Sequence, residues 1–149
     1  MIVNGWTLYA LPKFTCQLER LAEQVEALAA KDPTKYMEHP SAKLLITIRR
    51  IILEMIPRDP NAAEFRQGNT LGVNYRHWFR AKFHQRFRLF FRFSNKEKVI
   101  IYAWMNDERT LRKAGAKTDP YRVFREMLEA GDPPPTMEAL LARARELKD

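Results

Sequence analysis

An alternating pattern in one short segment constrains the fold more than any other feature of this sequence. Residues 80–93 read RAKFHQRFRLFFRF, with basic side chains at even positions and mainly aromatic or aliphatic side chains at odd positions. Because successive side chains of a β-strand point to opposite faces of a sheet, this alternation predicts strands with one basic face and one apolar face. We therefore expect strands over 78–84 and 87–94, with the odd-numbered aromatic residues turned towards a core.

The loop between these two strands decides whether the basic residues share a face. A two-residue loop would place odd positions opposite even ones, and the cations would split. A three-residue loop over 84–86 would pair Lys82 with Arg88 and Arg80 with Phe90, so that the cations lie on one face. Like charges directly opposite each other destabilise a sheet, so a protein that keeps this pairing is expected to bind something negative. The alternative is that the long side chains extend separately into water at little cost.

Hydrophobic periodicity predicts helices on either side of these strands. Apolar residues recur every three or four positions in 14–28 and 44–56, which favours a helical hairpin whose second helix is capped by Ser41. The other expected elements are a strand at 6–11, a loop at 57–75, a central strand at 99–105 covered on both faces, helical pieces at 106–115 and 119–131, and a last helix from Thr136 after the DPPP break.

Together these elements predict one α+β domain over residues 1–149. Its sheet is expected to be mostly antiparallel, with helices on one face. The N-terminal helical hairpin packs on that face, and additional C-terminal helices follow, with residues 132–149 as a C-terminal extension helix whose apolar face runs from Met137 to Leu147.

The net charge of +8 is concentrated in the strand region. Residues 76–98 carry eight Lys or Arg against Glu97 alone, whereas residues 1–75 and 99–149 are close to neutral. Such a focused positive field attracts phosphate-rich partners, and Arg and Lys are both good ligands for phosphate. The competing interpretation is a solvated strand face that is kept basic for solubility.

Several classes of protein receive no support from the sequence. No apolar run reaches the roughly 18 residues of a membrane-spanning helix, and the N-terminus lacks the charged and apolar regions of a secretory signal. Cys16 is the only cysteine, which excludes an internal disulfide and a cysteine-rich metal site and favours a reducing, cytoplasmic setting. No HExxH motif, glycine-rich phosphate loop or nucleophile elbow is present.

Seven motifs give the chain a resemblance to the YhaV toxin family, bacterial type II toxins related to the RelE-like ribonucleases. In chain order they are NGWTLYA, SAKLL, FRQGNTLG, WFRAKF, RFRLFFRFSNKEKVIIYAWMNDE, TLR and KTDPYRVFREML. The resemblance implies a RelE-like endoribonuclease that uses no metal or other cofactor. It implies cleavage of mRNA, on the ribosome, by attack of the substrate's 2′-hydroxyl on the adjacent phosphate, which inhibits translation and growth.

The resemblance also implies a partner. A cognate antitoxin similar to PrlF, with an AbrB-type fold, would neutralise the toxin. Operator DNA would be bound only through the toxin–antitoxin complex, which would repress its own operon. No membrane is implied.

Carried over by position, the resemblance assigns roles to four residues. Arg88 matches the family arginine of the middle strand and Arg112 the arginine after the last strand, and both are expected to stabilise the charge on the reacting phosphate. Lys82 and Tyr121, the latter roughly at the place of the C-terminal tyrosine, are the expected proton-transfer groups. RNA contacts are expected from Arg80, Arg86, Arg92, His84, Trp78 and Lys117.

Two alternatives stay open at this level. His77 or His84 could join the proton transfer because both border the basic strands, although a lone histidine is more often structural. Trp78 is also an ordinary core aromatic. The competing functional class is a non-catalytic RNA- or ribosome-binding protein that uses the same basic face, and composition alone does not separate it from a nuclease.

Overall fold

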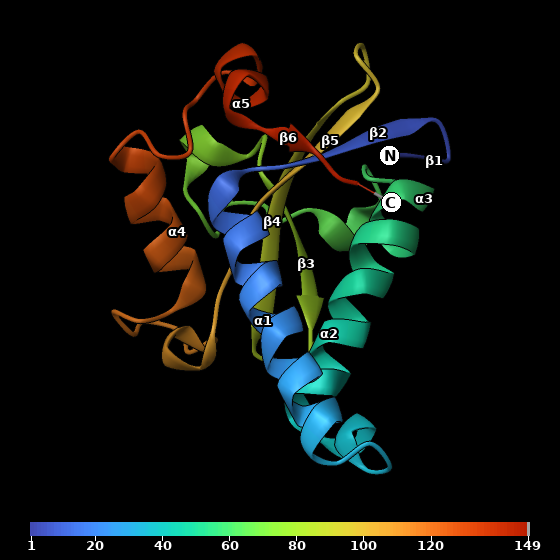
Figure 1. The fold of residues 1–149 in the computed structure, drawn as a ribbon. Helices are drawn as coiled ribbons and strands as arrows, with labels where there is room; N and C mark the ends of the chain where they lie inside the picture. Colours follow the sequence, from blue (N-terminus) through green and yellow to red (C-terminus); the bar gives the residue numbers. More distant parts are fainter. Residues whose placement is uncertain (149) are drawn as a thin grey trace.

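The computed structural model describes residues 1–148, which form a six-stranded sheet with helices on both faces (Figure 1). The strand order is β1-β2-β5-β4-β3, with β6 beside β2. Only the β2–β5 pair is parallel among the pairs described, so the predicted α+β class with a mostly antiparallel sheet is confirmed. The strands are β1 Ile2–Val3, β2 Trp6–Ala10, β3 Phe79–Phe83, β4 Phe87–Ser94, β5 Val99–Met105 and β6 Arg145–Glu146.

The central strand β5 is covered on both faces, as predicted. All of its residues, Val99 to Met105, are buried. It lies between the parallel neighbour β2 and the antiparallel neighbour β4. The sequence predicted β4 and β5 with the bounds that the structure has and placed β3 one residue too long at each end.

The N-terminal helical hairpin packs on one face of the sheet. Helix α1 spans Pro12–Lys31, and α2 spans Pro40–Arg50 and continues through a wider π-helical turn at Ile51–Met55 into α3, Ile56–Arg58. None of the described helices, α1 included, is long and apolar enough to cross a bilayer.

The cap of α2 differs from the prediction. His39, not Ser41, is the N-cap, and its Nδ1 accepts a hydrogen bond from the Ser41 backbone nitrogen at 3.0 Å. Pro40 occupies the first helical position, where its fixed φ favours the helix and its missing N–H costs nothing. The helix therefore begins two residues earlier than it would with Ser41 as its N-cap.

The hairpin and the odd-numbered face of the strands form one core. Phe79, Phe87 and Phe93 pack at its margin. The prediction that odd positions face the helices is confirmed. The buried contributors include Phe14 and Leu21 of α1, Leu45 and Ile48 of α2, Leu8 of β2, Phe83 of β3, and Leu89 and Phe91 of β4.

The prediction of helices on only one face is wrong, because α4 (Pro120–Glu129) covers the opposite face. Phe124 of α4 stacks on Phe90 of β4 with ring centroids 4.3 Å apart and planes 10° apart. Trp78 and Leu128 belong to the same cluster. Helix α4 has an apolar stripe at spacings of three and four, and the even-numbered Phe90 gives this stripe a surface to bury against.

Two C-terminal segments also differ from the prediction. Residues 106–115 are not a helical piece: only Glu108–Thr110 forms a 3₁₀ turn, because the Asp107 and Thr110 side chains satisfy local backbone groups and close it. The last helix, α5, is Met137–Arg143 and ends earlier than expected, since β6 then pairs with β2. The predicted loop at 57–75 starts inside α3, which ends at Arg58, and then contains short 3₁₀ turns at Ala63–Phe65 and Val73–Tyr75 and an isolated bridge from Arg66 to Phe79.

The cap of α5 gives a stability prediction. Thr136 Oγ1 accepts a hydrogen bond from the Ala139 backbone nitrogen at 3.1 Å, and Leu140 of the same helix is fully buried. Thr136→Ala should lower the free energy of unfolding by about 1 kcal/mol in urea titrations, because that helix donor loses its acceptor. Thr136→Ser, which keeps the hydroxyl, is the control. Equal stability of the Ala variant and the wild type would contradict this role for the cap.

Candidate functional site

The β3–β4 hairpin places the basic residues on one face, as the three-residue loop predicted. Residues 84–86 form the loop. Lys82 pairs with Arg88, and Arg80 pairs with Phe90. The even-numbered side chains therefore share the face that α4 covers.

The start of α4 brings a tyrosine onto these arginines. Asp119 caps the helix, with Oδ2 accepting from the Tyr121 backbone nitrogen at 3.1 Å, and Pro120 takes the first helical position. The Tyr121 hydroxyl accepts hydrogen bonds from Arg80 Nε at 2.8 Å and from Arg88 Nε at 3.1 Å. Three residues from three elements thus meet at one oxygen atom.

Arg80 and Arg88 are buried without a carboxylate partner. Their exposed fractions are 8% and 7%, and their remaining hydrogen bonds go to backbone carbonyls: Glu64 for Arg80, and Gln85 and Phe87 for Arg88. Among residues 1–148 neither guanidinium forms an ion pair. Buried charges are costly unless they are paired, so this uncompensated positive charge is suited to an anionic ligand.

A third arginine lies against the same tyrosine. The guanidinium carbon of Arg112 is 4.7 Å from the centre of the Tyr121 ring. Its Nη1 lies 2.8 Å from Oδ1 of the buried Asp119, which also accepts from the Lys113 backbone nitrogen at 2.7 Å. Asp119 therefore fixes both Arg112 and Tyr121. Arg80, Arg88, Arg112, Asp119 and Tyr121 are called the tyrosine–arginine site below.

Asn106 ties the segment that carries Arg112 to β4. Its Oδ1 accepts from the Arg88 backbone nitrogen at 2.7 Å, and its Nδ2 donates to the carbonyls of Arg86 at 3.0 Å and Thr110 at 2.7 Å. The Arg112 backbone nitrogen also donates to the Arg86 carbonyl at 2.9 Å. These bonds hold an otherwise irregular segment in a fixed position beside the strands.

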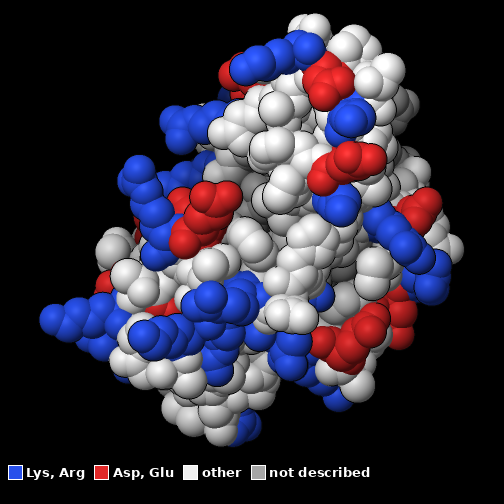
Figure 2. Space-filling view, turned by 90° about the horizontal axis from the view of Figure 1, so that it is seen from below, with Lys and Arg blue, Asp and Glu red and all other residues white. Residues whose placement is uncertain are grey.

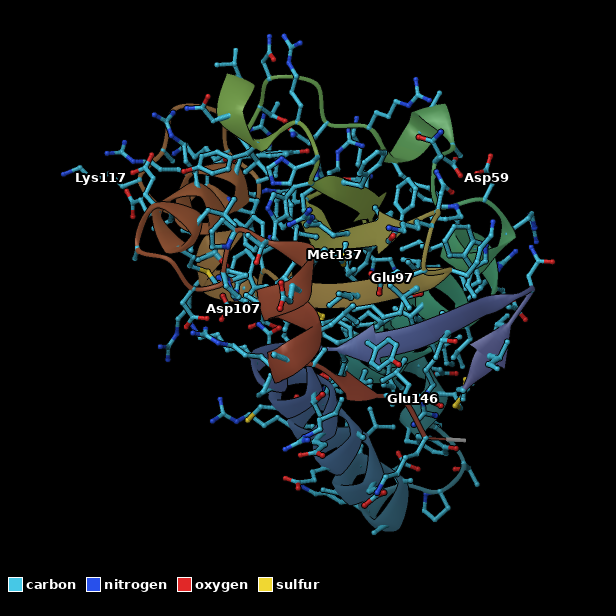
Figure 3. All side chains as sticks on the ribbon, turned by 90° about the horizontal axis from the view of Figure 1, so that it is seen from above. Asp59, Glu97, Asp107, Lys117, Met137 and Glu146 are labelled. Atoms are coloured by element: carbon cyan, nitrogen blue, oxygen red, sulfur yellow. The ribbon has the colours of Figure 1, made fainter. Side chains whose placement is uncertain are left out.

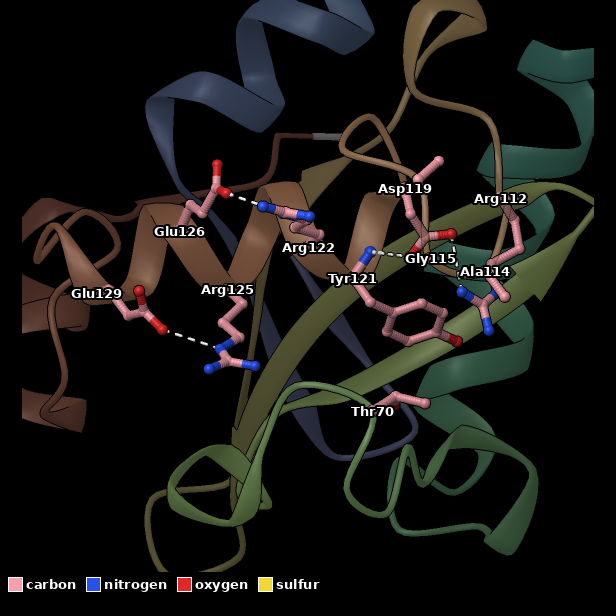
Figure 4. Close-up of a pocket in the computed structure, with 11 residues that line it drawn as sticks. Thr70, Arg112, Ala114, Gly115, Asp119, Tyr121, Arg122, Arg125, Glu126 and Glu129 are labelled. Carbon is pink, nitrogen blue, oxygen red and sulfur yellow. Dashed lines mark hydrogen bonds and ion pairs between the residues drawn. The ribbon is translucent and has the colours of Figure 1, made fainter.

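A hollow of about 560 Å³ opens beside the site (Figure 4). Tyr121 and Arg112 line it at one end, next to Asp119. Thr70 and residues 114–116 form the facing walls, and α4 contributes Arg122, Arg125, Glu126 and Glu129. The hollow therefore opens onto Tyr121, Arg112 and Asp119 of the tyrosine–arginine site.

The structure contradicts the expected RNA contact from Trp78 and shows the alternative, a core aromatic. Its side chain is 1% exposed and meets Phe124 edge-on at 5.1 Å, so no base can reach its ring. Arg92 lies over the Trp78 ring, and its Nη1 donates to the Pro135 carbonyl at 2.9 Å. Burial lowers the pKa of the Arg92 guanidinium, and the packing of Arg92 contributes to holding the C-terminal segment on the sheet.

The two candidate histidines do not join the tyrosine–arginine site. His84 Nε2 lies 2.8 Å from Thr47 Oγ1 of α2, and its ring lies near Phe83 and Phe87, on the hairpin side of the sheet. Burial, and secondly the charge of Arg92, lowers the pKa of His77. Both effects favour the neutral form of His77 over the charged form.

The remaining basic candidates are exposed. Lys82 and Arg86 lie beside Arg88, and Arg86 Nε donates to the Arg112 carbonyl at 3.1 Å. Lys117 projects from the edge of the molecule (Figure 3). In the view from below, basic side chains crowd the side where Figure 1 places α4, with acidic side chains between them (Figure 2).

Sequence reasoning missed Asp119 and Asn106 as members of this region. Asp119 followed by Pro120 is a recognisable start of a helix, and this signal could have placed a carboxylate at the first turn of α4. Asn106 carries no comparable signal, since its role depends on the turn that brings residues 106–112 back to β4. Within residues 1–148 no group of three or more His, Cys, Asp or Glu residues is arranged to hold a metal ion.

Comparison with known proteins gives matches over nearly the whole chain. Residues 8–145 match the YhaV toxin family, described as a toxin with endonuclease activity of a toxin–antitoxin system. A toxin YhaV of Escherichia coli O6:H1 (strain CFT073) is 48% identical over 146 residues, covering 97% of this chain and 95% of the relative. The ribonuclease toxin YhaV of Escherichia coli K12 is 47% identical with the same coverage. No solved structure gives a significant match.

Proposed function

Because the chain belongs to the YhaV toxin family, toxins with endonuclease activity of toxin–antitoxin systems, we propose that it cleaves RNA at the tyrosine–arginine site. One observation carries the proposal. Two buried arginines without carboxylate partners donate to the hydroxyl of Tyr121, at the edge of an open hollow. A phosphodiester supplies the negative charge that this arrangement lacks.

The proposed reaction is an internal transfer at phosphorus. The 2′-oxygen of a ribose forms a bond to the adjacent phosphorus while the bond from phosphorus to the 5′-oxygen breaks, which leaves a 2′,3′-cyclic phosphate and a 5′-hydroxyl. The 2′-hydroxyl loses a proton and the 5′-oxygen gains one. No metal ion takes part in the proposed reaction.

The arginines stabilise the charge that develops on the phosphate oxygens. Nη2 of Arg88 makes no hydrogen bond to other residues in 1–148, so it is available to an oxygen of the reacting phosphate. Arg112 is held by Asp119 through one nitrogen, and its partly exposed guanidinium lines the hollow. Both groups are positioned before the substrate binds, which is the condition for effective electrostatic stabilisation.

Tyr121 is the proposed general acid. Its hydroxyl oxygen accepts from two guanidinium groups, so its own hydrogen points away from both and is available to the departing 5′-oxygen. Lys82, exposed and opposite Arg88, is the proposed acceptor of the proton from the 2′-hydroxyl, a role that requires the neutral amine because the ammonium has no lone pair. Arg86 and Lys117 would contact the phosphates of the bound strand.

The proposed partners follow from the same family resemblance. The substrate is mRNA on the ribosome, and its cleavage inhibits translation and growth. The antitoxin is a PrlF-like protein with an AbrB-type fold, and the complex binds operator DNA only through the antitoxin.

Incubation of the purified chain with mRNA tests the proposal, with and without ribosomes and with EDTA in each arm. We expect cuts that persist in EDTA and leave cyclic phosphate ends, with faster cleavage in the ribosome arm. An RNA with a single 2′-deoxy nucleotide at the cut site should resist cleavage there. Retention of RNA or ribosomes without any cut would contradict the proposal and support a non-catalytic binding protein.

A further inference from the structure

Helix α4 presents arginines and glutamates to the same hollow, beyond the tyrosine–arginine site (Figure 4). All four side chains are exposed. Arg122 Nε lies 3.3 Å from Glu126 Oε1, and Arg125 Nε lies 2.9 Å from Glu129 Oε1. Each arginine uses only its Nε in these pairs, and its two terminal nitrogens make no hydrogen bond to residues in 1–148.

These ion pairs are poorly suited to a purely structural role. Exposed pairs between positions i and i+4 of a helix contribute little to stability, because solvent screens them and both side chains lose freedom. A phosphate can therefore replace the carboxylate at small cost. The planar guanidinium offers a phosphate two parallel N–H donors, which is a stronger arrangement than the single Nε contact that the glutamates make.

The position of the pairs matches the path of a nucleotide chain that reaches Tyr121. Tyr121 and Glu129 are eight residues apart on the helix, which corresponds to a rise of about 12 Å. Successive nucleotides of a stacked strand are about 3.4 Å apart, so this part of α4 is long enough to lie beside more than one nucleotide. The facing wall has small side chains at Ala114, Gly115 and Ala116, which leave room for a sugar–phosphate backbone.

We propose that Arg122 and Arg125 bind phosphate groups of the RNA strand next to the cleaved bond, displacing Glu126 and Glu129. The inference rests on the proposed RNA cleavage at the adjacent site. It adds a second binding surface, the α4 arginine track, made of Arg122 and Arg125. The two glutamates compete with RNA for this track and so limit its affinity for nucleic acid.

Binding of a 2′-O-methyl RNA oligonucleotide, which lacks the attacking hydroxyl and stays intact, tests the track. The double substitution Arg122→Gln and Arg125→Gln should lower the slope of log Kd against log salt concentration by about 1.4, or about 0.7 for each lost phosphate contact. Affinity at low salt should fall about tenfold. Glu126→Gln with Glu129→Gln should instead tighten binding, because the competing carboxylates are gone.

The end of helix α2 and the π-helical turn that continues it supply matched controls. Arg50 and Glu54 form an exposed i,i+4 pair at 3.9 Å on the opposite side of the sheet. Arg50→Gln should change the salt slope much less than either α4 arginine, and Glu54→Gln should not tighten binding. Melting temperatures of all variants check that the fold is intact.

The outcomes separate this inference from the proposed function. Suppose that wild-type protein cleaves RNA but the α4 double variant binds the oligonucleotide with wild-type affinity and salt slope. Phosphate binding by the α4 arginine track is then contradicted, and the proposed RNA cleavage is unaffected. The same result is expected if the hollow binds an acidic protein segment instead of RNA. A change of equal size in Arg50→Gln would also overturn the track. Wild-type protein that neither binds nor cuts RNA would overturn the proposed function itself.

Discussion

Tyr121→Phe should slow RNA cleavage by a factor of about 10²–10⁴, the usual contribution of a positioned proton-transfer group. The substitution removes one oxygen atom and keeps the ring, which packs edge-on against Phe90 at 5.6 Å. Arg80 Nε and Arg88 Nε both lose their acceptor, so the free energy of unfolding should also fall, by about 1–3 kcal/mol for buried donors left unsatisfied. Single-turnover cleavage rates and urea titrations measure the two effects separately.

Tyr102→Phe is the matched control for this prediction. The Tyr102 hydroxyl donates to the Ile52 carbonyl at 2.6 Å within the other core, and burial raises the pKa of Tyr102 well above its ordinary value. This variant should lose stability to a similar degree and keep the wild-type cleavage rate. A Tyr121→Phe variant that cleaves as fast as Tyr102→Phe would show that the Tyr121 hydroxyl takes no part in the chemistry.

Arg88→Ala should lower the cleavage rate by a factor of about 10²–10³, as expected for the loss of one preorganised donor to a charged transition state. The arginine acts in two ways in this account: its free Nη2 contacts the phosphate, and its Nε orients the Tyr121 hydroxyl. The variant should lose some stability as well, since the carbonyls of Gln85 and Phe87 lose a donor. Rates are therefore compared at a temperature where urea titrations show the variant to be folded.

Two further substitutions serve as comparisons for Arg88→Ala. Arg88→Lys keeps a positive charge but offers a point donor instead of a planar fork, so its rate should lie between those of wild type and Arg88→Ala. Arg49→Ala removes an exposed arginine from α2, on the other face of the sheet, and should leave the rate unchanged. Wild-type cleavage by folded Arg88→Ala would contradict the role of Arg88.

Local rules of sequence reduced the register of the β3–β4 hairpin to two alternatives. The alternation of basic and apolar residues fixes which side chains share a face, and the length of the 84–86 loop fixes how the two strands pair. Both are properties of consecutive residues. The pairing of Lys82 with Arg88 was one of two registers that the sequence left open, and the structure has the one that a three-residue loop produces.

The burial of Arg80 and Arg88 could not be predicted in the same way. It depends on where α4 docks, and an apolar stripe on a helix does not state which surface it will cover. Phe90, an apolar residue among even-numbered cations, was the available signal, because a buried aromatic on that face needs a partner such as Phe124. The expected open basic face is instead a covered face with a hollow at its edge.

The segment 106–118 and strand β6 show the other limits of sequence reasoning. Asp107 and Thr110 use side-chain hydrogen bonds to close a short turn, and such polar capping competes with helix formation. Residues 145 and 146 form a strand through main-chain pairing with β2, which leaves no period in the side chains. Arg112 lies within the irregular segment 106–118 and Asp119 directly follows it, so their ion pair depends on tertiary structure that no local pattern predicts.

The central claim is that Tyr121 and Arg88 act as one catalytic unit, and a double-mutant cycle on the cleavage rate tests it most directly. Groups that act together lose most of their joint effect when either is removed. With the hydroxyl and the guanidinium 3.1 Å apart, the account predicts that the double variant Tyr121→Phe with Arg88→Ala cleaves RNA nearly as fast as the slower single variant. A double variant whose loss equals the product of the two single losses would contradict the claim, because the two side chains would then act independently.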